Sequence, residues 1–509
     1  MDVYSGLNPY FGDLHSHCGI SYGFGTLKEA FQNARERLDF CSVTGHAFWP
    51  DMPVPTEHNQ PIIDFHLKGF AKLKRLWPQV LKECAEASEE GQFLTFPGYE
   101  MHSMSDGDYT VVYRDFSTPI VYAHSLAELK TSLLHQKEEQ GHDFLAFPHH
   151  IAYRRGTRGI NWDSFDPRFS PLVEIISMHG CSEGGPFARP FLFVMGPADG
   201  EGTMQYGLEK GYIFGVLGNT DHHSAHPGTY GRGLTGVWAE SLTRQAVWEA
   251  LNARRTYALT GDRIHLAYSL NDAPMGSVLA PTPSRELNIT VRATAAIDCV
   301  DIIRNNELIK RFSACDVPQQ DPGDSVRTHV YLELGWGHPR HSVHWDVDVR
   351  LSTGRIVSVE PRFRGRETLS PLEHNGGTTD TLYYSRCTSV SERSVHLVTE
   401  TQGNPNQVTN TSQGICLEVE MPLQGKILLD CNGKKEAVLL EQLLKRAFTG
   451  SLIDDLESPA WRLHRAPLPW ESCWRLSYSE QRDERDVFSA RVRQLNDQWD
   501  WSSPIFVQT

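Results

Sequence analysis

Residues 1–263 alternate short apolar runs with amphipathic helical patterns, and this alternation limits the fold more than any other feature of the chain. Runs such as 40–46, 144–150 and 172–180 have the length of buried strands. Thr26 and Ser125 each precede a helical pattern and are followed three residues later by Glu, the spacing of a capping box. We therefore predict an α/β domain with a mainly parallel sheet, either open or closed as a barrel.

The pattern changes after Asp262. Residues 265–360 contain period-two strands separated by polar stretches rich in Pro, Gly and Asp, which favours a β-sandwich. A polar loop then leads to a further β-rich portion, interrupted by a helical pattern over 436–448. We expect three units, and leave open whether the last two are continuous: an α/β domain over 1–263, a β-sandwich domain over 264–365 and a second β-rich portion over 366–509.

Composition excludes several classes of protein. Hydrophobic residues make up 39% of the chain and charged residues 22%, as in an ordinary globular protein. The net charge of −15 without a basic block argues against a general nucleic-acid binder. The apolar runs are too short to span a bilayer and no secretory signal is visible, so we predict a cytoplasmic protein without a membrane partner. Ten cysteines without a CxxC pair indicate reduced thiols, and a homo-oligomer is left open.

Histidines and carboxylates stand at the ends of nearly all the predicted strands. His15 and His17 are two residues apart, so in an extended segment both imidazoles project to the same side. Other strand ends carry His46, Glu100, His149, His150, His179, Asp221 and His223. The carboxyl ends of barrel strands converge on one face, so these side chains would meet there. Imidazoles mixed with carboxylates suit Zn, Mn or Fe rather than Ca. By contrast, we interpret four histidines without such partners as surface residues: His58, His66, His135 and His142.

These motifs resemble the PHP family, named for its polymerase and histidinol phosphatase members. The resemblance covers roughly residues 8–263 and rests on 13-DLHSH, 42-SVTGH, Glu100, 147-FPHH and 219-NTDHH. The stretch 242–264 and the ending 499–507 resemble a branch of PHP-like proteins with a C-terminal β-rich extension. The resemblance implies a distorted seven-stranded β/α barrel, followed by a β-sandwich-like region, with two or three divalent transition-metal ions in a cleft.

The resemblance also implies a ligand set. His15, His17, Glu100 and Asp221 would hold one ion. Glu100 would bridge to a second ion, joined by Asp108 and by either His150 or His149, because the register of that pair is open. His46 and His223 would serve a third ion. Gly23 stands where the family often has a His or Asp, which leaves this third site short of a ligand; Tyr22 and His226 are weak candidates to replace it.

Such a centre predicts hydrolysis. Two ions about 4 Å apart would bring the pKa of a bridging water toward 7 and hold the oxygens of a transferring group. His179 or His223 could protonate the leaving oxygen. Four arginines could bind phosphate or carboxylate groups near the cleft: Arg154, Arg155, Arg158 and, more weakly, Arg232.

We therefore expect a metal-dependent phosphoesterase that hydrolyses a small anionic phosphorylated molecule through a metal-bridging hydroxide. Two alternatives stay open. The same centre could attack a non-phosphate bond, such as an amide or a lactone. The chain could also be a weakly active, metal-stabilised binding protein whose C-terminal tryptophans stack against carbohydrate.

Overall fold

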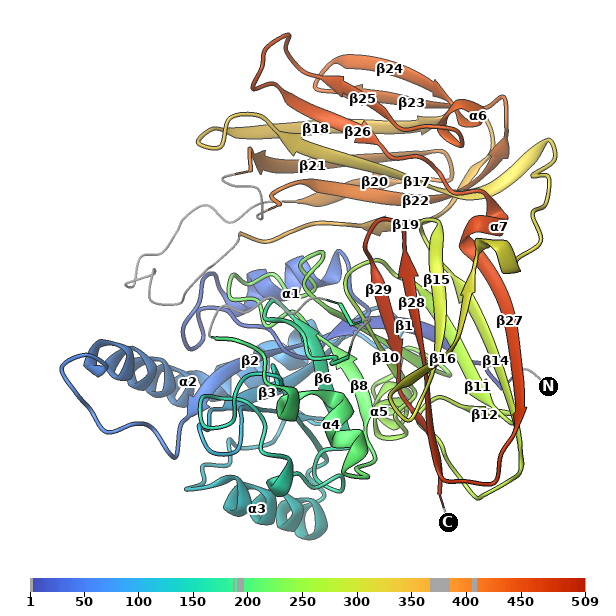
Figure 1. Ribbon diagram of the computed structural model, residues 1–509. Helices are drawn as coiled ribbons and strands as arrows, with labels where there is room; N and C mark the ends of the chain where they lie inside the picture. Colours follow the sequence, from blue (N-terminus) through green and yellow to red (C-terminus); the bar gives the residue numbers. More distant parts are fainter. Residues whose placement is uncertain (1–2, 186–187, 190–195, 367–384, 405–409, 509) are drawn as a thin grey trace.

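The computed structural model describes residues 3–185, 188–189, 196–366, 385–404 and 410–508. It has an α/β part formed by the first half of the chain, an antiparallel β region beside it, and a β-sandwich above both (Figure 1). Many strands and few helices make the protein a β-rich member of the mixed α/β class. None of the helices in the described ranges is long and apolar enough to cross a membrane.

The α/β part contains, in chain order, β1 (Asn8–Asp13), α1 (Leu27–Arg35), β2 (Phe40–Phe48), α2 (Gln60–Ala87), β3 (Leu94–Met101), β4 (Tyr109–Tyr113), α3 (Leu126–Gln140), β5 (Phe144–Pro148), β6 (Leu172–Ser177), β7 (Gly180–Cys181), α4 (Met204–Glu209), β8 (Gly215–Gly218), β9 (Leu234–Ala239), α5 (Arg244–Asn252) and β10 (Thr256–Leu259). Both predicted helix starts are confirmed, since the side chains of Thr26 and Ser125 accept hydrogen bonds from the backbone N–H groups of Glu29 and Glu128.

The sheet of this part is mixed, so the prediction of a mainly parallel sheet is wrong. Strands β1, β2 and β3 are parallel, whereas β4, β5, β9 and β10 pair antiparallel with their neighbours. Only residues 102–108 join β3 to β4, and so short a link cannot make the crossover that parallel pairing requires.

The strands nevertheless surround a common interior. β6 and β8 pair with each other and pack against β5 on one side and against β9 and β10 on the other. Among the described residues, no hydrogen-bonded ladder joins β5 to β6 or β8 to β10. The closed seven-stranded barrel is therefore not confirmed.

The second half of the chain is built of strands. Its elements are β11 (His265–Leu270), β12 (Ala273–Pro274), β13 (Val278–Leu279), β14 (Ser284–Arg292), β15 (Ile297–Arg304), β16 (Glu307–Ser313), β17 (Ser325–Trp336), β18 (Ser342–Leu351), β19 (Arg355–Pro361), β20 (Arg386–Val390), β21 (Ser394–Gln402), β22 (Gln413–Pro422), β23 (Lys426–Cys431), β24 (Lys434–Leu439), α6 (Leu440–Leu443), β25 (Phe448–Ser451), β26 (Pro459–Leu463), α7 (Pro469–Ser472), β27 (Cys473–Gln481), β28 (Asp486–Gln494), β29 (Trp499–Ser502) and β30 (Ile505–Val507). The helix predicted over 436–448 is wrong, because β24 pairs with β23 there and only one helical turn follows.

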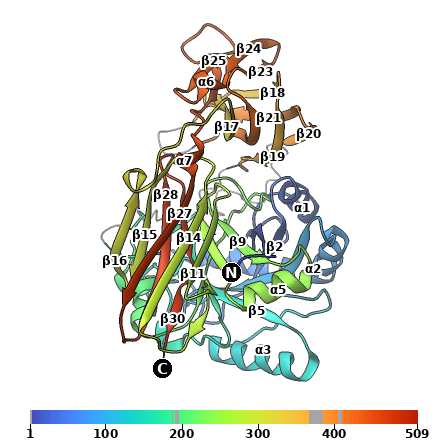
Figure 2. The same cartoon turned by 90° about the vertical axis from the view of Figure 1, so that its right-hand side faces the viewer.

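The last strands of the chain return to the α/β part. β29 pairs antiparallel with β10, and β28 and β30 extend the same sheet beside it. β11, β14 and β27 form a separate sheet next to these strands (Figure 2). Residues from both ends of the sequence thus share one hydrophobic core, for example Phe11, Tyr257 and Phe488.

The upper sandwich has its own core between two five-stranded sheets. Their strand orders are β19-β22-β17-β26-β25 and β20-β21-β18-β23-β24. All members of the core between them come from residues 326–466. Strands on both sides of residue 365 pair within these sheets, as β19 does with β22. The division into 1–263, 264–365 and 366–509 stays a prediction.

Candidate metal centre

The predicted ligands come together where the strands of the α/β part end. His15 and His17 directly follow β1, His46 lies near the end of β2 and Glu100 near the end of β3. His149 and His150 follow β5, and Asp221 and His223 follow β8. Each of these residues is at least nine-tenths buried. The convergence predicted from the sequence is therefore present in the fold.

The first group of ligand atoms joins β1, β3 and the segment after β8. Nitrogen or oxygen atoms of His15, His17, Glu100 and Asp221 all lie within 4.8 Å of one another. His17 Nε2 lies 3.0 Å from Asp221 Oδ1 and 3.2 Å from His15 Nε2. Glu100 Oε2 lies 3.3 Å from both imidazole nitrogens. Two carboxylates and two imidazoles directed at one point form a donor set suited to a transition-metal ion.

The electrostatics of this group keep its two carboxylates ionised and favour a protonated His15. Burial opposes ionisation of Glu100, but His46 and His102 outweigh it and hold the pKa of that carboxyl well below its ordinary value. Burial likewise opposes ionisation of Asp221, and its histidine partners lower its pKa well below the usual range. Burial opposes protonation of His15, but Asp221 and Glu174 outweigh it and raise the pKa of His15 well above its ordinary value. Ionised carboxylates and neutral imidazoles are the forms that coordinate a cation, so a bound ion would displace the proton of His15.

Glu174 on β6 contacts His15 through Nδ1, the ring nitrogen that does not face the other ligands. The sequence analysis did not identify this residue. Its Oε2 lies 2.9 Å from His15 Nδ1 and accepts a hydrogen bond from Asn219 Nδ2 at 3.0 Å. A hydrogen bond from Nδ1 leaves the lone pair of His15 Nε2 directed at the group. The available signal was a lone acid inside the apolar strand 172–177, where burial without a partner is costly.

A second group lies on the other side of Glu100. Glu100 Oε1 is 3.2 Å from His102 Nδ1 and 3.3 Å from His149 Nε2. Asp108 Oδ2 is 2.8 Å from His102 Nδ1 and 3.5 Å from His150 Nε2. The two oxygens of Glu100 thus face two different groups. Both His149 and His150 lie at this site, so the structure does not reduce the pair to a single ligand.

His102 is the second residue that the sequence analysis missed. It belongs to a group of potential ligands with His46 and Glu100, and Tyr22 Oη lies 3.0 Å from its Nε2. His102 stands two residues after Glu100, at the end of the same strand. The reasoning that paired His15 with His17 would have found it.

A third group contains His17, His46 and His223. The Nδ1 of His223 lies 2.9 Å from the backbone oxygen of Asp221, so it donates there and Nε2 is left for the group. Gly23 has φ +132°, and a Cβ there would lie 2.9 Å from the backbone oxygen of His223. No side chain fits at this position, which explains why the expected ligand is missing.

Neither weak candidate replaces that ligand. The ring of Tyr22 stacks on His46 with a centroid distance of 3.7 Å, and its hydroxyl turns to His102. His226 is buried against Gly365 and is outside every ligand group found among the described residues.

His179 lies beside the first group. Its Nε2 is 3.0 Å from Asp221 Oδ2 and its Nδ1 is 2.9 Å from Tyr153 Oη. Burial lowers its pKa below the ordinary value, against the opposing effect of Asp221. Asp221 itself has φ 52° and His150 has φ 34°, both in the left-handed region that non-glycine residues seldom adopt. Such backbone strain clusters at functional sites.

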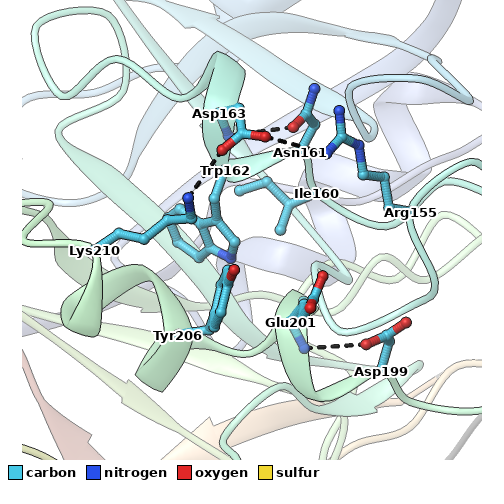
Figure 3. Close-up of a pocket in the computed structure, with 10 residues that line it drawn as sticks. Arg155, Ile160, Asn161, Trp162, Asp163, Asp199, Glu201, Tyr206 and Lys210 are labelled. Carbon is cyan, nitrogen blue, oxygen red and sulfur yellow. Dashed lines mark hydrogen bonds and ion pairs between the residues drawn. The ribbon is translucent and has the colours of Figure 1, made fainter.

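Of the four arginines predicted to bind substrate, Arg158 lies beside the ligand groups. Arg158 lies at the second group, with Nη1 3.3 Å from Asp108 Oδ2 and the guanidinium 5.0 Å from the centre of the Trp49 ring. Arg154 is exposed. Arg155 pairs with Asp163 at 3.2 Å and lines a separate surface pocket (Figure 3). Arg232 is partly buried between β8 and β9.

The prediction that His66 is a surface residue is wrong. Its side chain on α2 is buried, with Nδ1 donating to the backbone oxygen of Ile62 at 2.7 Å. Its Nε2 is therefore the acceptor for Arg158 Nη2, 3.4 Å away. Periodicity could not place it, because α2 reaches the cluster only through the tertiary fold. His58 and His135 are exposed, and His142 is partly buried.

Comparisons with known proteins add little on function. Residues 222–270 match a family described as protein of unknown function (DUF3604). An uncharacterised protein of Chlamydia pneumoniae is 29% identical over 260 residues, covering 47% of this chain and 41% of that protein. Another of Chlamydia trachomatis is 28% identical over 274 residues, covering 49% and 43%. The chain thus covers about two fifths of the length of these relatives.

Two solved structures show weak similarity. One is a two-domain protein of Bacteroides vulgatus containing a predicted PHP-like metal-dependent phosphoesterase, with 12% identity and a TM-score of 0.31, covering 85% of this chain and 96% of that one. The other is PsfC from Pseudomonas syringae, with 14% identity and a TM-score of 0.32, covering 49% and 91%. Scores of this size do not establish a shared fold.

Proposed function

We propose that the protein is a PHP-like metal-dependent hydrolase that cleaves phosphoesters of a small anionic molecule. The observation that carries the proposal is the position of Glu100, whose two oxygens face two adjacent groups of buried ligands. A bridging carboxylate between two donor sets is the arrangement of a two-ion hydrolytic centre. When bound, the ions activate water as a nucleophile and stabilise the charge that develops on the transferred group.

The residues of the chain divide the remaining tasks. His15, His17, Glu100 and Asp221 hold one ion, and Glu100, His102, Asp108 and His149 or His150 hold another. His46 and His223 offer a third, weaker position. The first and third assignments follow the sequence motifs and the ligand groups, and the second follows the distances that join Glu100 and Asp108 to the histidines around them. Zn, Mn and Fe all suit the donors.

His179 is the proposed proton donor to the leaving oxygen. Its contacts with Asp221 and Tyr153 orient the ring at the edge of the first group. His223 is the weaker candidate for this role, because its remaining nitrogen, Nε2, is also assigned to the third group of ligands.

Arg158 is the proposed contact for a non-reacting phosphoryl oxygen. Its side chain is 17% exposed, and its guanidinium lies beside the second group against Asp108, His66 and Trp49. Arg154, Arg155 and Arg232 remain predicted substrate contacts with less support, since Arg155 is paired away from the centre.

The two alternatives differ in support. Hydrolysis of an amide or lactone needs the same metal centre and differs only in substrate. A carbohydrate-binding protein has less support, because five of the C-terminal tryptophans named as stacking platforms are less than one-tenth exposed: Trp345, Trp461, Trp474, Trp499 and Trp501. A cytoplasmic location and a homo-oligomer stay predictions.

The test is a hydrolase screen of the full chain, reconstituted separately with Mn²⁺, Zn²⁺ and Fe²⁺, on phosphomonoesters, phosphodiesters, amides and lactones. We expect turnover of a phosphoester. Arg158→Ala should then lower kcat/KM by about 10- to 150-fold, the effect of losing one charge-assisted hydrogen bond. Arg168→Ala is the matched control and should match the wild type, because Arg168 is exposed and pairs with Asp166. Turnover of amides or lactones alone would replace the phosphoesterase proposal by the first alternative.

A further inference from the structure

The segment 220–230, here called the ligand loop, lies between β8 and β9 and carries both Asp221 and His223. On one side it is held by the end of β1. The Asp13 carboxylate accepts hydrogen bonds from the backbone N–H groups of Thr220 at 3.1 Å and Gly228 at 2.8 Å. The backbone N–H of His17 donates to the backbone oxygen of His222 at 2.8 Å. The position of this loop therefore decides where two predicted metal ligands lie.

The other side of the ligand loop contacts residues 362–366, here called the strap. The strap continues from β19, the strand of the upper sandwich that lies nearest α1 in both views (Figures 1 and 2). Tyr230 N–H donates to the backbone oxygen of Phe363 at 2.9 Å. Gly365 N–H donates to Thr229 Oγ1 at 2.8 Å. A third bond, from a loop side chain to the strap backbone, joins Ser224 Oγ to the oxygen of Arg366 at 3.0 Å.

Packing between the strap and the ligand loop leaves no spare room at Gly365. A Cβ at this position would lie 2.5 Å from His226 Cβ and 2.9 Å from His222 Cε1. The first of these atoms is attached directly to the backbone of the loop, so it cannot move away by a change of rotamer. The close approach therefore requires glycine.

Buried polar residues fix the strap to the rest of the protein. Arg362 Nη2 lies 3.0 Å from Asp262 Oδ1, and both side chains are at most 1% exposed. Asp262 Oδ1 also accepts a hydrogen bond from Tyr230 Oη at 2.6 Å, so one carboxylate holds the strap and the loop together. Removing either Arg362 or Asp262 alone would leave a buried charge without its partner, which is strongly destabilising.

The sandwich reaches the ligand loop by a second route through α1. The Asn33 side chain donates to the backbone oxygen of Ala225 at 2.8 Å and accepts from Arg386 Nη1 at 3.0 Å. Arg386 opens β20 in the second sheet of the sandwich. Two separate parts of the sandwich thus contact the same loop, one directly and one through a single side chain.

We infer that the strap positions Asp221 and His223 for binding a divalent metal ion, so that the C-terminal β-sandwich is a structural part of the metal centre. The inference rests on the proposed metal centre and does not depend on the reaction or the substrate. The strap residues are positioning residues, since they act on the ligands through the loop.

The experiment measures Mn²⁺ binding to the metal-free full chain by isothermal titration calorimetry. Gly365→Ala forces the strap and the loop apart, and Thr229→Val removes the hydrogen bond from Gly365. We expect each to weaken binding of one ion by about 10- to 100-fold, the usual effect of losing a residue that supports a metal ligand. Thr229→Ser keeps the hydroxyl and should bind as the wild type does. Gly200→Ala is the matched control, because a Cβ there meets no atom within 4 Å.

The outcomes separate the strap from the metal centre itself. A merely structural role would lower the melting temperature of the metal-free variants and leave their Mn²⁺ affinity unchanged, which overturns the inference. If Gly365→Ala fails to fold, Thr229→Val and its Thr229→Ser rescue decide the question. A wild type that binds no Mn²⁺, Zn²⁺ or Fe²⁺ overturns the proposed function, and the inference with it.

Discussion

Replacing Glu174 by Gln tests whether the first ligand group is a metal site. The substitution keeps the size of the side chain, and the amide oxygen can still accept from His15 Nδ1 and Asn219 Nδ2, now 2.9 and 3.0 Å from Glu174 Oε2. It removes one buried negative charge, since Glu174 is 1% exposed. The geometry of the imidazole is therefore preserved while its basicity toward a cation falls.

The expected size of the effect follows from that position. Supporting carboxylates behind a ligating histidine typically contribute about 10- to 100-fold in metal affinity. This corresponds to about 1.4–2.8 kcal/mol, at about 1.4 kcal/mol for each factor of ten. The assay is calorimetric titration of the metal-free protein with Mn²⁺, checked by the metal content after gel filtration. Glu139→Gln on α3 is the control, because Glu139 is exposed.

Unchanged affinity in Glu174→Gln would refute the reasoning. It would mean that His15 Nε2 is not a metal ligand, or that the contact with Glu174 only fills space in the core. In the second case the melting temperature of the metal-free variant should fall while its titration curve matches that of the wild type.

Two further predictions concern other buried groups. His102→Gln should weaken binding of the second ion and leave binding of the first unchanged, so the Mn²⁺ titration should lose one step. Two unchanged binding steps would exclude His102 as a ligand. Asp500 is fully buried, and burial raises its pKa well above the ordinary 3.8, against the opposing effect of a backbone hydrogen bond from Trp501. A raised pKa in the folded state means that its contribution to stability is complete below pH 3.8 and is lost as the pH rises through the folded value. Asp500→Asn should therefore reduce the fall in melting temperature between pH 5 and pH 8, and an equal fall in both proteins would contradict this account.

The ligand positions could be predicted because each depends on a strand end. His15, Glu100 and Asp221 stand after apolar runs that the sequence displays directly. The ligand-bearing strands β1, β2 and β3 run parallel, and β5 runs in the same direction because β4 is antiparallel to both β3 and β5, so their carboxyl ends lie at one edge. The direction of pairing was predicted less well. Short links such as 102–108 favour antiparallel neighbours, and the sequence analysis gave this less weight than the alternation of helices and strands.

The residues that were missed depend on tertiary contacts. Glu174 and His66 are polar groups on elements that look apolar or amphipathic, and their roles come from His15 and Arg158, which are far away in the sequence. The return of β29 to β10 has the same cause. No local pattern in 499–502 marks it as a neighbour of 256–259, because pairing between distant strands is set by the packing of the whole core.

Tyr22 contacts both the third and the second group of ligands. Gly23 leaves the third group short of one ligand, and the ring of Tyr22 stacks on His46 there. The hydroxyl of the same residue contacts His102, an additional imidazole in the second group. A hydrogen bond from His102 Nε2–H to the oxygen of Tyr22 would leave the lone pair of Nδ1 facing Glu100 and Asp108. This contact supports the second group, while Tyr22 gives the third group no replacement for its missing ligand, which fits the proposed two-ion centre.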